Sequence, residues 1–218
     1  MNVNRNENQN ANRNRNRILA ATVLRVRSFT ENAREGFFLT REEGVVRATV
    51  YGGGKSKLRA YVSPFNSGVL YLYHDPVRDS NKVTDFDCQN WRPGLREKYE
   101  RTMAADEIAK TILAGLGGSF DDALQTADET LDALEDAADI QITPLLVHFW
   151  WRWAAILGIR PSLDRLGDSL GYRLPALGDG AATWLATTGS LPPAQIGRFP
   201  LDQPALEEAA TFCHALLR

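Results

Sequence analysis

The sequence predicts an α+β protein in which a small β-barrel precedes an α-helical domain. From residue 18 to about 87, short runs of β-branched and aromatic residues alternate with turn residues, which is typical of strands. After Pro93, apolar residues recur near every 3.6 positions, which indicates amphipathic helices. The chain has 218 residues, 44% of them hydrophobic, enough for two modest hydrophobic cores or one larger one. We expect a tail at 1–17, a barrel at 18–90 and a helical domain at 91–218.

The tail is expected to be disordered. Residues 2–17 are almost entirely Asn and Arg, and such a polar tract cannot bury enough apolar area to offset the entropy of ordering. Its arginines would add nonspecific affinity for phosphates, and an inert extension is the equal alternative.

Five strands are expected in the barrel. Their ranges are Leu19–Phe29, Gly36–Thr40, Val45–Tyr51, Val69–His74 and Lys82–Phe86. In the first strand Leu24 and Val26 alternate with Arg25 and Arg27, so one face is apolar and the other is basic. Five short strands in this space favour a closed barrel of the OB type, whose open face often binds nucleic acid.

The segment Gly52–Ser56 ends like a phosphate-binding loop. A Walker loop requires glycine where this chain has Thr49, and it requires a following helix where we expect Pro64 and a strand. We interpret the segment as a mobile glycine hairpin that presents cations to phosphates beside aromatic rings able to stack on unpaired bases. A solvated loop with ordinary core tyrosines is the alternative. The side chains concerned are Lys55, Lys57, Arg59, Tyr51 and Tyr61.

Three helices are expected between about 94 and 160. The first carries an apolar stripe through Leu95, Tyr99, Met103, Ile108, Ile112 and Leu116, and the second spans Phe120 to Ala137 with an acidic outer face. The third is expected to begin with Thr143 as N-cap and Pro144 at the first helical position, and to end at Gly158. Two further helices are expected at Ala181–Thr187 and Pro204–Leu217.

Net charge divides the chain into two unlike parts. Residues 1–84 contain 14 Lys and Arg against 7 Asp and Glu, or +7, whereas residues 85–218 contain 11 against 20, or −9. A clustered basic surface is the electrostatic footprint of a nucleic-acid-binding protein, although scattered charges would only be solvated. The basic front half suits a polyanion, and Arg34 and Arg47 join Arg25 and Arg27 as candidate contacts.

The run Phe149-Trp150-Trp151-Arg152-Trp153 places aromatic rings around nearly the whole third helix. A central core helix is one interpretation. In the other, Trp150 and Trp153 line a groove for a partner's hydrophobic tail while Arg152 binds its carboxylate.

Catalytic and metal-binding patterns are incomplete. Gly167–Gly171 fits G-x-S-x-G, but no buried strand leads into Ser169 and the histidine that follows, His214, lies in an amphipathic helix. Two distant cysteines, Cys88 and Cys213, form no C-x-x-C pair for zinc. We therefore expect neither an enzyme nor a cofactor, although a nuclease or esterase stays the third class to test. Apolar runs too short for a membrane span, and the lack of a secretory signal, favour the cytoplasm.

Several segments together resemble the RecO family of recombination mediators. They are Ala21–Arg27, Glu31–Arg34, Leu39–Gly44, the basic loop Gly54–Arg59 with the Pro64-Phe65 pair behind it, and Leu157–Arg165. The resemblance covers about Ala21 to Leu191 in collinear order. It departs from the family where many RecO proteins begin a zinc site with C-x-x-C, because this chain has Leu166 and Ser169 there. The zinc site is therefore expected to be degenerate or absent.

The resemblance implies binding of single- and double-stranded DNA, strand annealing, and loading of the recombinase RecA together with RecR. It also implies contact with the C-terminal tail of single-strand-binding protein, for which the acidic helical domain is the expected location. The rival hypothesis is a non-catalytic scaffold whose basic barrel binds an acidic protein instead of DNA.

Overall fold

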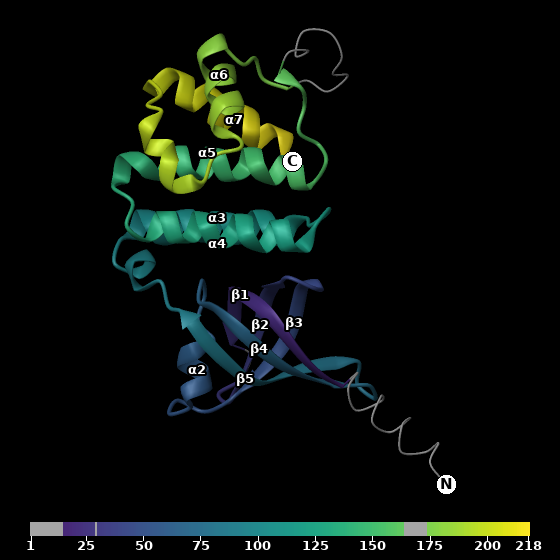
Figure 1. Ribbon diagram of the computed structural model, residues 1–218. Helices are drawn as coiled ribbons and strands as arrows, with labels where there is room; N and C mark the ends of the chain where they lie inside the picture. The colour runs from purple at the N-terminus through teal and green to yellow at the C-terminus, as the bar shows by residue number, and fades with distance from the viewer. Residues whose placement is uncertain (1–14, 29, 164–173) are drawn as a thin grey trace. The chain divides into compact units, whose positions relative to one another are not determined.

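The computed structural model describes residues 15–28, 30–163 and 174–218, and the chain divides into two compact units, Met1–Trp91 and Arg92–Arg218. The first unit is a closed five-stranded barrel and the second is helical (Figure 1). The predicted α+β architecture, an OB-like barrel followed by helices, is confirmed.

All five predicted strands form, and each begins earlier than expected. They are β1 (Asn16–Ser28), β2 (Ala33–Thr40), β3 (Gly44–Tyr51), β4 (Ser67–Asp75) and β5 (Ser80–Asn90). The barrel order is β1-β2-β3-β5-β4, closed by antiparallel pairing of β1 with β4. The β3–β5 seam is parallel and short, since only Thr49 and Val50 pair there. Asn16 and Arg17, expected in the tail, belong to β1 because they pair with β4.

Alternate residues of the strands fill the barrel. Val23 and Phe38 are fully buried in this core, and Val26 packs against it. The register of β1 shifts between Val23 and Arg25, which makes Leu24 an extra, unpaired residue at an irregularity of the strand. Simple alternation predicted Leu24 on the apolar face of the barrel, but it is not part of the barrel core. The shift keeps Arg25 and Arg27 on the outside.

The predicted glycine hairpin is wrong. A short helix, α2 (Lys57–Tyr61), follows Gly52–Ser56 (Figure 1). Leu58 and Tyr61 pack against the barrel core, and this packing stabilises a helix too short to persist alone. A helix does follow the loop, so this part of the case against a phosphate-binding loop no longer holds. The missing glycine still argues against one, because its position is occupied by Thr49 within β3.

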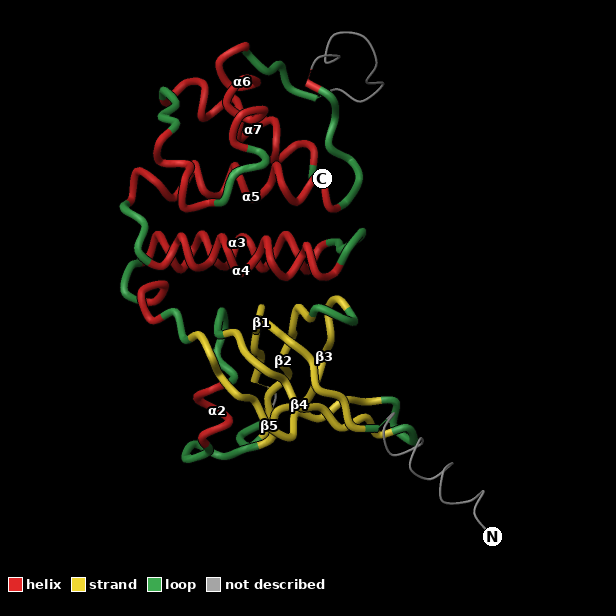
Figure 2. Tube along the Cα trace, in the orientation of Figure 1, coloured by secondary structure: helices red, strands yellow, loops and turns green. Residues whose placement is uncertain are grey.

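The helical unit is built from five α-helices in its described residues (Figure 2). They are α3 (Tyr99–Ala114), α4 (Phe120–Glu135), α5 (Asp139–Ile156), α6 (Asp179–Thr188) and α7 (Gln203–Leu216), with 3-10 turns at Pro93–Arg96 and Pro193–Arg198. The inner face of α3 is made mainly of alanines with Ile108 and Ile112, whereas Tyr99 and Met103 of the predicted stripe are exposed. Leu95 lies in the preceding turn.

The predicted start of α5 at Thr143 and Pro144 is wrong. The helix begins at Asp139, and the Gln141 Oε1 atom accepts a hydrogen bond from the Ala138 backbone N–H at 2.9 Å. Pro144 lies in the second turn, where its missing N–H leaves the Ile140 carbonyl without its helical donor. Ile140 is exposed, so water can replace that donor.

Candidate nucleic-acid interface

The outer wall of β1, β2 and β3 carries a row of arginines around one aromatic ring. Arg25 pairs with Phe37 across β1 and β2, and Phe37 pairs with Arg47 across β2 and β3. Directly paired residues point to the same face of a sheet, so these three side chains lie side by side. The Arg27 guanidinium lies 5.5 Å from the centre of the Phe37 ring. We call Arg25, Arg27, Phe37 and Arg47 the Phe37 platform.

Two of the platform's three cations are accessible to phosphate, and the third, Arg25, is half-buried. Arg27 is exposed, and the Arg47 side chain retains 71% of its exposure although it lies 3.3 Å from Glu35. An ion pair at that exposure contributes little and can be exchanged. Tyr51 is also exposed on β3, paired across from Ala33, so a second ring lies farther along the same wall.

Sequence reasoning missed Phe37. Phe38 lies in the barrel core, so its neighbour must point outward in a strand. The adjacent Phe37-Phe38 pair was the available signal, and only the register shows which arginines surround the outer ring.

The cations around α2 have two different roles. Lys55 and Lys57 are exposed, whereas the Arg59 Nη1 atom donates to the Glu31 carbonyl at 3.4 Å. Arg34 is half-buried, and its Nη2 atom donates to the carbonyls of Arg59 at 2.6 Å and Val62 at 3.3 Å. Burial, together with the nearby Arg59 charge, lowers the pKa of Arg34. Arg34 therefore positions α2, and the two lysines are the accessible charges.

The wall formed by β4 and β5 is acidic. Asp85 and Asp87 are exposed on β5, and the turn before it exposes Asp79. Lys82 on this wall lies 3.9 Å from Asp75. The barrel is thus polarised, because its basic side chains gather on β1–β3 and around α2.

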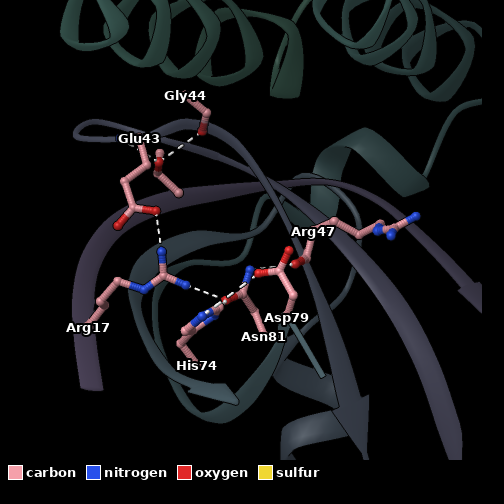
Figure 3. Close-up of polar contacts among 8 residues, drawn as sticks. Arg17, Glu43, Gly44, Arg47, His74, Asp79 and Asn81 are labelled. Atoms are coloured by element: carbon pink, nitrogen blue, oxygen red, sulfur yellow. Dashed lines mark hydrogen bonds and ion pairs between the residues drawn. The ribbon is translucent and has the colours of Figure 1, made fainter. Parts of the chain in front are cut away.

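A polar cluster closes the barrel seam (Figure 3). The Arg17 guanidinium binds both Glu43 and Asn81, and the Asn81 Nδ2 atom donates to the Arg47 carbonyl at 3.0 Å. The His74 Nδ1 atom lies 3.1 Å from the Asn81 Oδ1 atom. The adjacent cleft of about 370 Å³ is lined by three carboxylates and by Arg47, so its net charge is negative and disfavours phosphate inside it, whereas the exposed Arg47 guanidinium remains accessible from solvent. Those carboxylates are Glu35, Glu43 and Asp79.

Trp150 and Trp153 line a second cleft, of about 240 Å³, in the helical unit. Both indoles are at least nine-tenths buried, and their Nε1 atoms have no hydrogen-bond partner among the described residues. Lys110 and Arg218 supply cations to the cleft lining, and Glu107, 3.7 Å from Lys110, supplies a carboxylate. Arg152 does not line it, since its Nη1 atom binds the Glu129 carboxylate at 2.7 Å. Burial opposes ionisation of Glu129, but the bonds from Arg152 and Gln125 prevail and lower its pKa.

In the part of the chain that the structure describes, no three His, Cys, Asp or Glu side chains are placed to hold a metal ion. Gly167–Gly171, with Ser169, and Leu166 lie outside the described residues. None of the described helices is both long enough and apolar enough to cross a bilayer.

Comparison with known proteins gives one informative match. No family model matches the chain. Over 129 residues the chain is 30% identical to the DNA repair protein RecO of Gloeobacter violaceus. The match covers 57% of this chain and 49% of that protein, so the chain spans about half the length of the curated relative it matches. The similarity to RecO inferred from short motifs therefore has support from a longer alignment.

Proposed function

We propose that the chain is a non-catalytic, RecO-like mediator of DNA repair and homologous recombination, which binds single- and double-stranded DNA through its barrel. The observation that carries the proposal is the row Arg25, Phe37 and Arg47 on the outer wall of an OB-like barrel. Arginines bind the phosphates of either form of DNA without regard to sequence, and the half-buried ring of Phe37 on the outer wall adds contact with unpaired bases. The similarity to RecO supports DNA repair as the setting, and the cytoplasm as the location.

Two single arginine variants test the location of the DNA site. Arg47 lies on the platform, and Arg78 is exposed next to the acidic wall, so Arg47→Ala and Arg78→Ala each remove one exposed cation of the barrel. We expect Arg47→Ala to reduce the slope of log K against log salt for single-stranded DNA by about 0.7, the value for one phosphate contact, and Arg78→Ala to leave it unchanged. Fluorescence anisotropy at several salt concentrations measures both slopes. Equal effects of the two changes would show that the platform is not the DNA site.

The helical unit is proposed to handle proteins. We propose that it contributes to contacts with RecR, and through RecR to RecA loading, because an acidic unit would repel phosphates across a shared face. For the tail of single-strand-binding protein, the cleft at Trp150 and Trp153 offers burial for an apolar side chain.

Two residues, Arg152 and Lys110, are candidates for the cation that binds the carboxylate of the tail. Arg152 would have to exchange Glu129 for the tail, whereas Lys110 lines the cleft and is bound to Asp106 at 2.9 Å in an exposed pair. Anisotropy with a labelled tail peptide, compared between Arg152→Ala and Lys110→Ala, distinguishes them. Loss of the responsible cation should weaken peptide binding by about 1 kcal/mol or more while DNA affinity stays unchanged. Equal peptide affinity in both variants and the parent would place the tail site elsewhere.

A further inference from the structure

We infer that the barrel has a second single-strand site, in which Lys57, Tyr61 and Trp91 bind a phosphate and an unpaired base of a second DNA strand. We call these three residues the α2 site. The inference rests on the proposed function and deepens it, because the Phe37 platform would hold one strand while the α2 site holds another.

Two aromatic rings from distant parts of the chain meet at this site. Tyr61 and Trp91 form an edge-to-face pair with ring centres 5.1 Å apart and an interplanar angle of 83°. Trp91 remains 43% exposed. A tryptophan that keeps this much surface in water forgoes burial energy, and such rings are enriched where a partner binds. The exposed indole, supported from one side by Tyr61, is suited to stacking on a base.

A cation lies next to these rings. Lys57 and Tyr61 are four residues apart in α2, so their side chains share one helical face. Lys57 is exposed, and the exposed Lys55 precedes the helix. The Arg59 guanidinium is bound to the Glu31 carbonyl, so Lys57 and not Arg59 supplies the cation beside the two rings. Exposed cations beside stacking rings are the combination by which proteins bind single strands without sequence preference.

The α2 site is separate from the Phe37 platform. The platform points outward from the wall of β1–β3, whereas α2 packs Leu58 and Tyr61 against the barrel core and contacts β3 and β5. The acidic side chains of the β4–β5 wall exclude a phosphate backbone from there. Within the described residues of the barrel, α2 is therefore the second surface that pairs cations with an outward-facing aromatic ring, and its ring, Trp91, is exposed.

Two strand sites on one small barrel have a functional consequence. Strands bound to the same molecule meet at an effective concentration set by the distance between the sites, which is far above that of dilute DNA. The α2 site should therefore contribute to annealing more than to the affinity for one strand.

The test counts oligonucleotides per chain. Fluorescein-labelled oligothymidine of about eight nucleotides, within the site size of one OB fold, is titrated into the full-length chain at low salt under tight-binding conditions. We expect two oligonucleotides per chain for the parent and one for Lys57→Ala/Trp91→Ala. The reciprocal variant, Arg25→Ala/Phe37→Leu/Arg47→Ala, should also bind one. Annealing of complementary strands should slow at least about tenfold in Lys57→Ala/Trp91→Ala, while affinity at the remaining site stays within about twofold.

A spectroscopic arm does not depend on the double variant folding. The other four tryptophans of the chain lie in the helical unit, where they are buried. Quenching of tryptophan emission by oligothymidine should therefore be seen in the parent and lost in Trp91→Phe. Quenching that persists in Trp91→Phe, or one oligonucleotide per parent chain, would overturn the α2 site and leave the proposed function standing. A parent that binds no oligothymidine would overturn both.

Discussion

Replacement of Phe37 by leucine should separate single-stranded from double-stranded DNA binding. Leucine keeps an apolar side chain on β2 and removes no charge, so the barrel and its arginines persist. What it removes is the aromatic face between Arg25 and Arg47. Duplex DNA keeps its bases stacked inside, so its affinity should not change.

The magnitude follows from the surroundings of the ring. Stacking of one base on an aromatic side chain contributes about 1–3 kcal/mol. In the free protein the Arg27 guanidinium already lies over Phe37, an interaction of about 0.5–1 kcal/mol at an exposed site, and an incoming base displaces it or shares the ring with it. The net loss in Phe37→Leu should be about 1–2 kcal/mol, or roughly 5- to 30-fold in the dissociation constant.

Tyr71 provides a matched control. It is a half-buried aromatic residue on β4, paired with Asp85 on the acidic wall. Anisotropy titrations of labelled oligothymidine and of a duplex should show weaker single-strand binding in Phe37→Leu, an unchanged salt slope, and no effect of Tyr71→Leu. If single-strand and duplex affinity fall together in Phe37→Leu, the stacking argument is refuted.

Three further predictions concern charge, protonation and thiol reactivity. Removal of the three cations around α2, by Lys55→Ala, Lys57→Ala and Arg59→Ala, should weaken binding of the second oligonucleotide and slow annealing, with the fold retained by circular dichroism. Unchanged annealing and two oligonucleotides per chain at low salt would show that these cations do not contact DNA. Burial lowers the pKa of His148 to about 4, so the unfolded chain binds a proton at this histidine before the folded chain does as pH falls below about 6.5. The helical unit should therefore lose about 3 kcal/mol of stability by pH 4 in urea titrations, and this loss should be absent from His148→Gln. Burial raises the pKa of Cys213, in α7, to about 12, so a thiol reagent at pH 8 should label at most Cys88 in the folded chain. Rapid labelling of both cysteines would contradict the burial of Cys213 in the packing of α7.

The sequence was sufficient for the barrel because alternation is a strong local signal. Each strand places every second residue inside, and the turn residues between the runs set the strand count. The same signal failed at α2, where five residues are too few for a helical period and tertiary packing of Leu58 and Tyr61 decides the structure. It also failed at Pro144, since a proline at the second turn of a helix and one at the first position look alike in sequence.

The candidate site was only partly predictable. Arg25, Arg27 and Arg47 could be named from charge, but their grouping around Phe37 depends on strand register, which the sequence does not specify between distant strands. Arg34 and Arg152 look like free cations in the sequence, whereas in the fold Arg34 binds carbonyls of the α2 segment and Arg152 binds Glu129. Such partners lie far away along the chain, so composition alone could not separate positioning residues from accessible ones.

The central claim is that the barrel binds DNA through its exposed cations, and the salt dependence of oligonucleotide binding by the unmodified chain tests it most directly. If the claim holds, log K falls linearly with log salt, by about 0.9 for each phosphate contact on duplex and about 0.7 on single strands. Flat or absent binding at low salt would contradict it and favour a scaffold whose basic barrel binds an acidic protein.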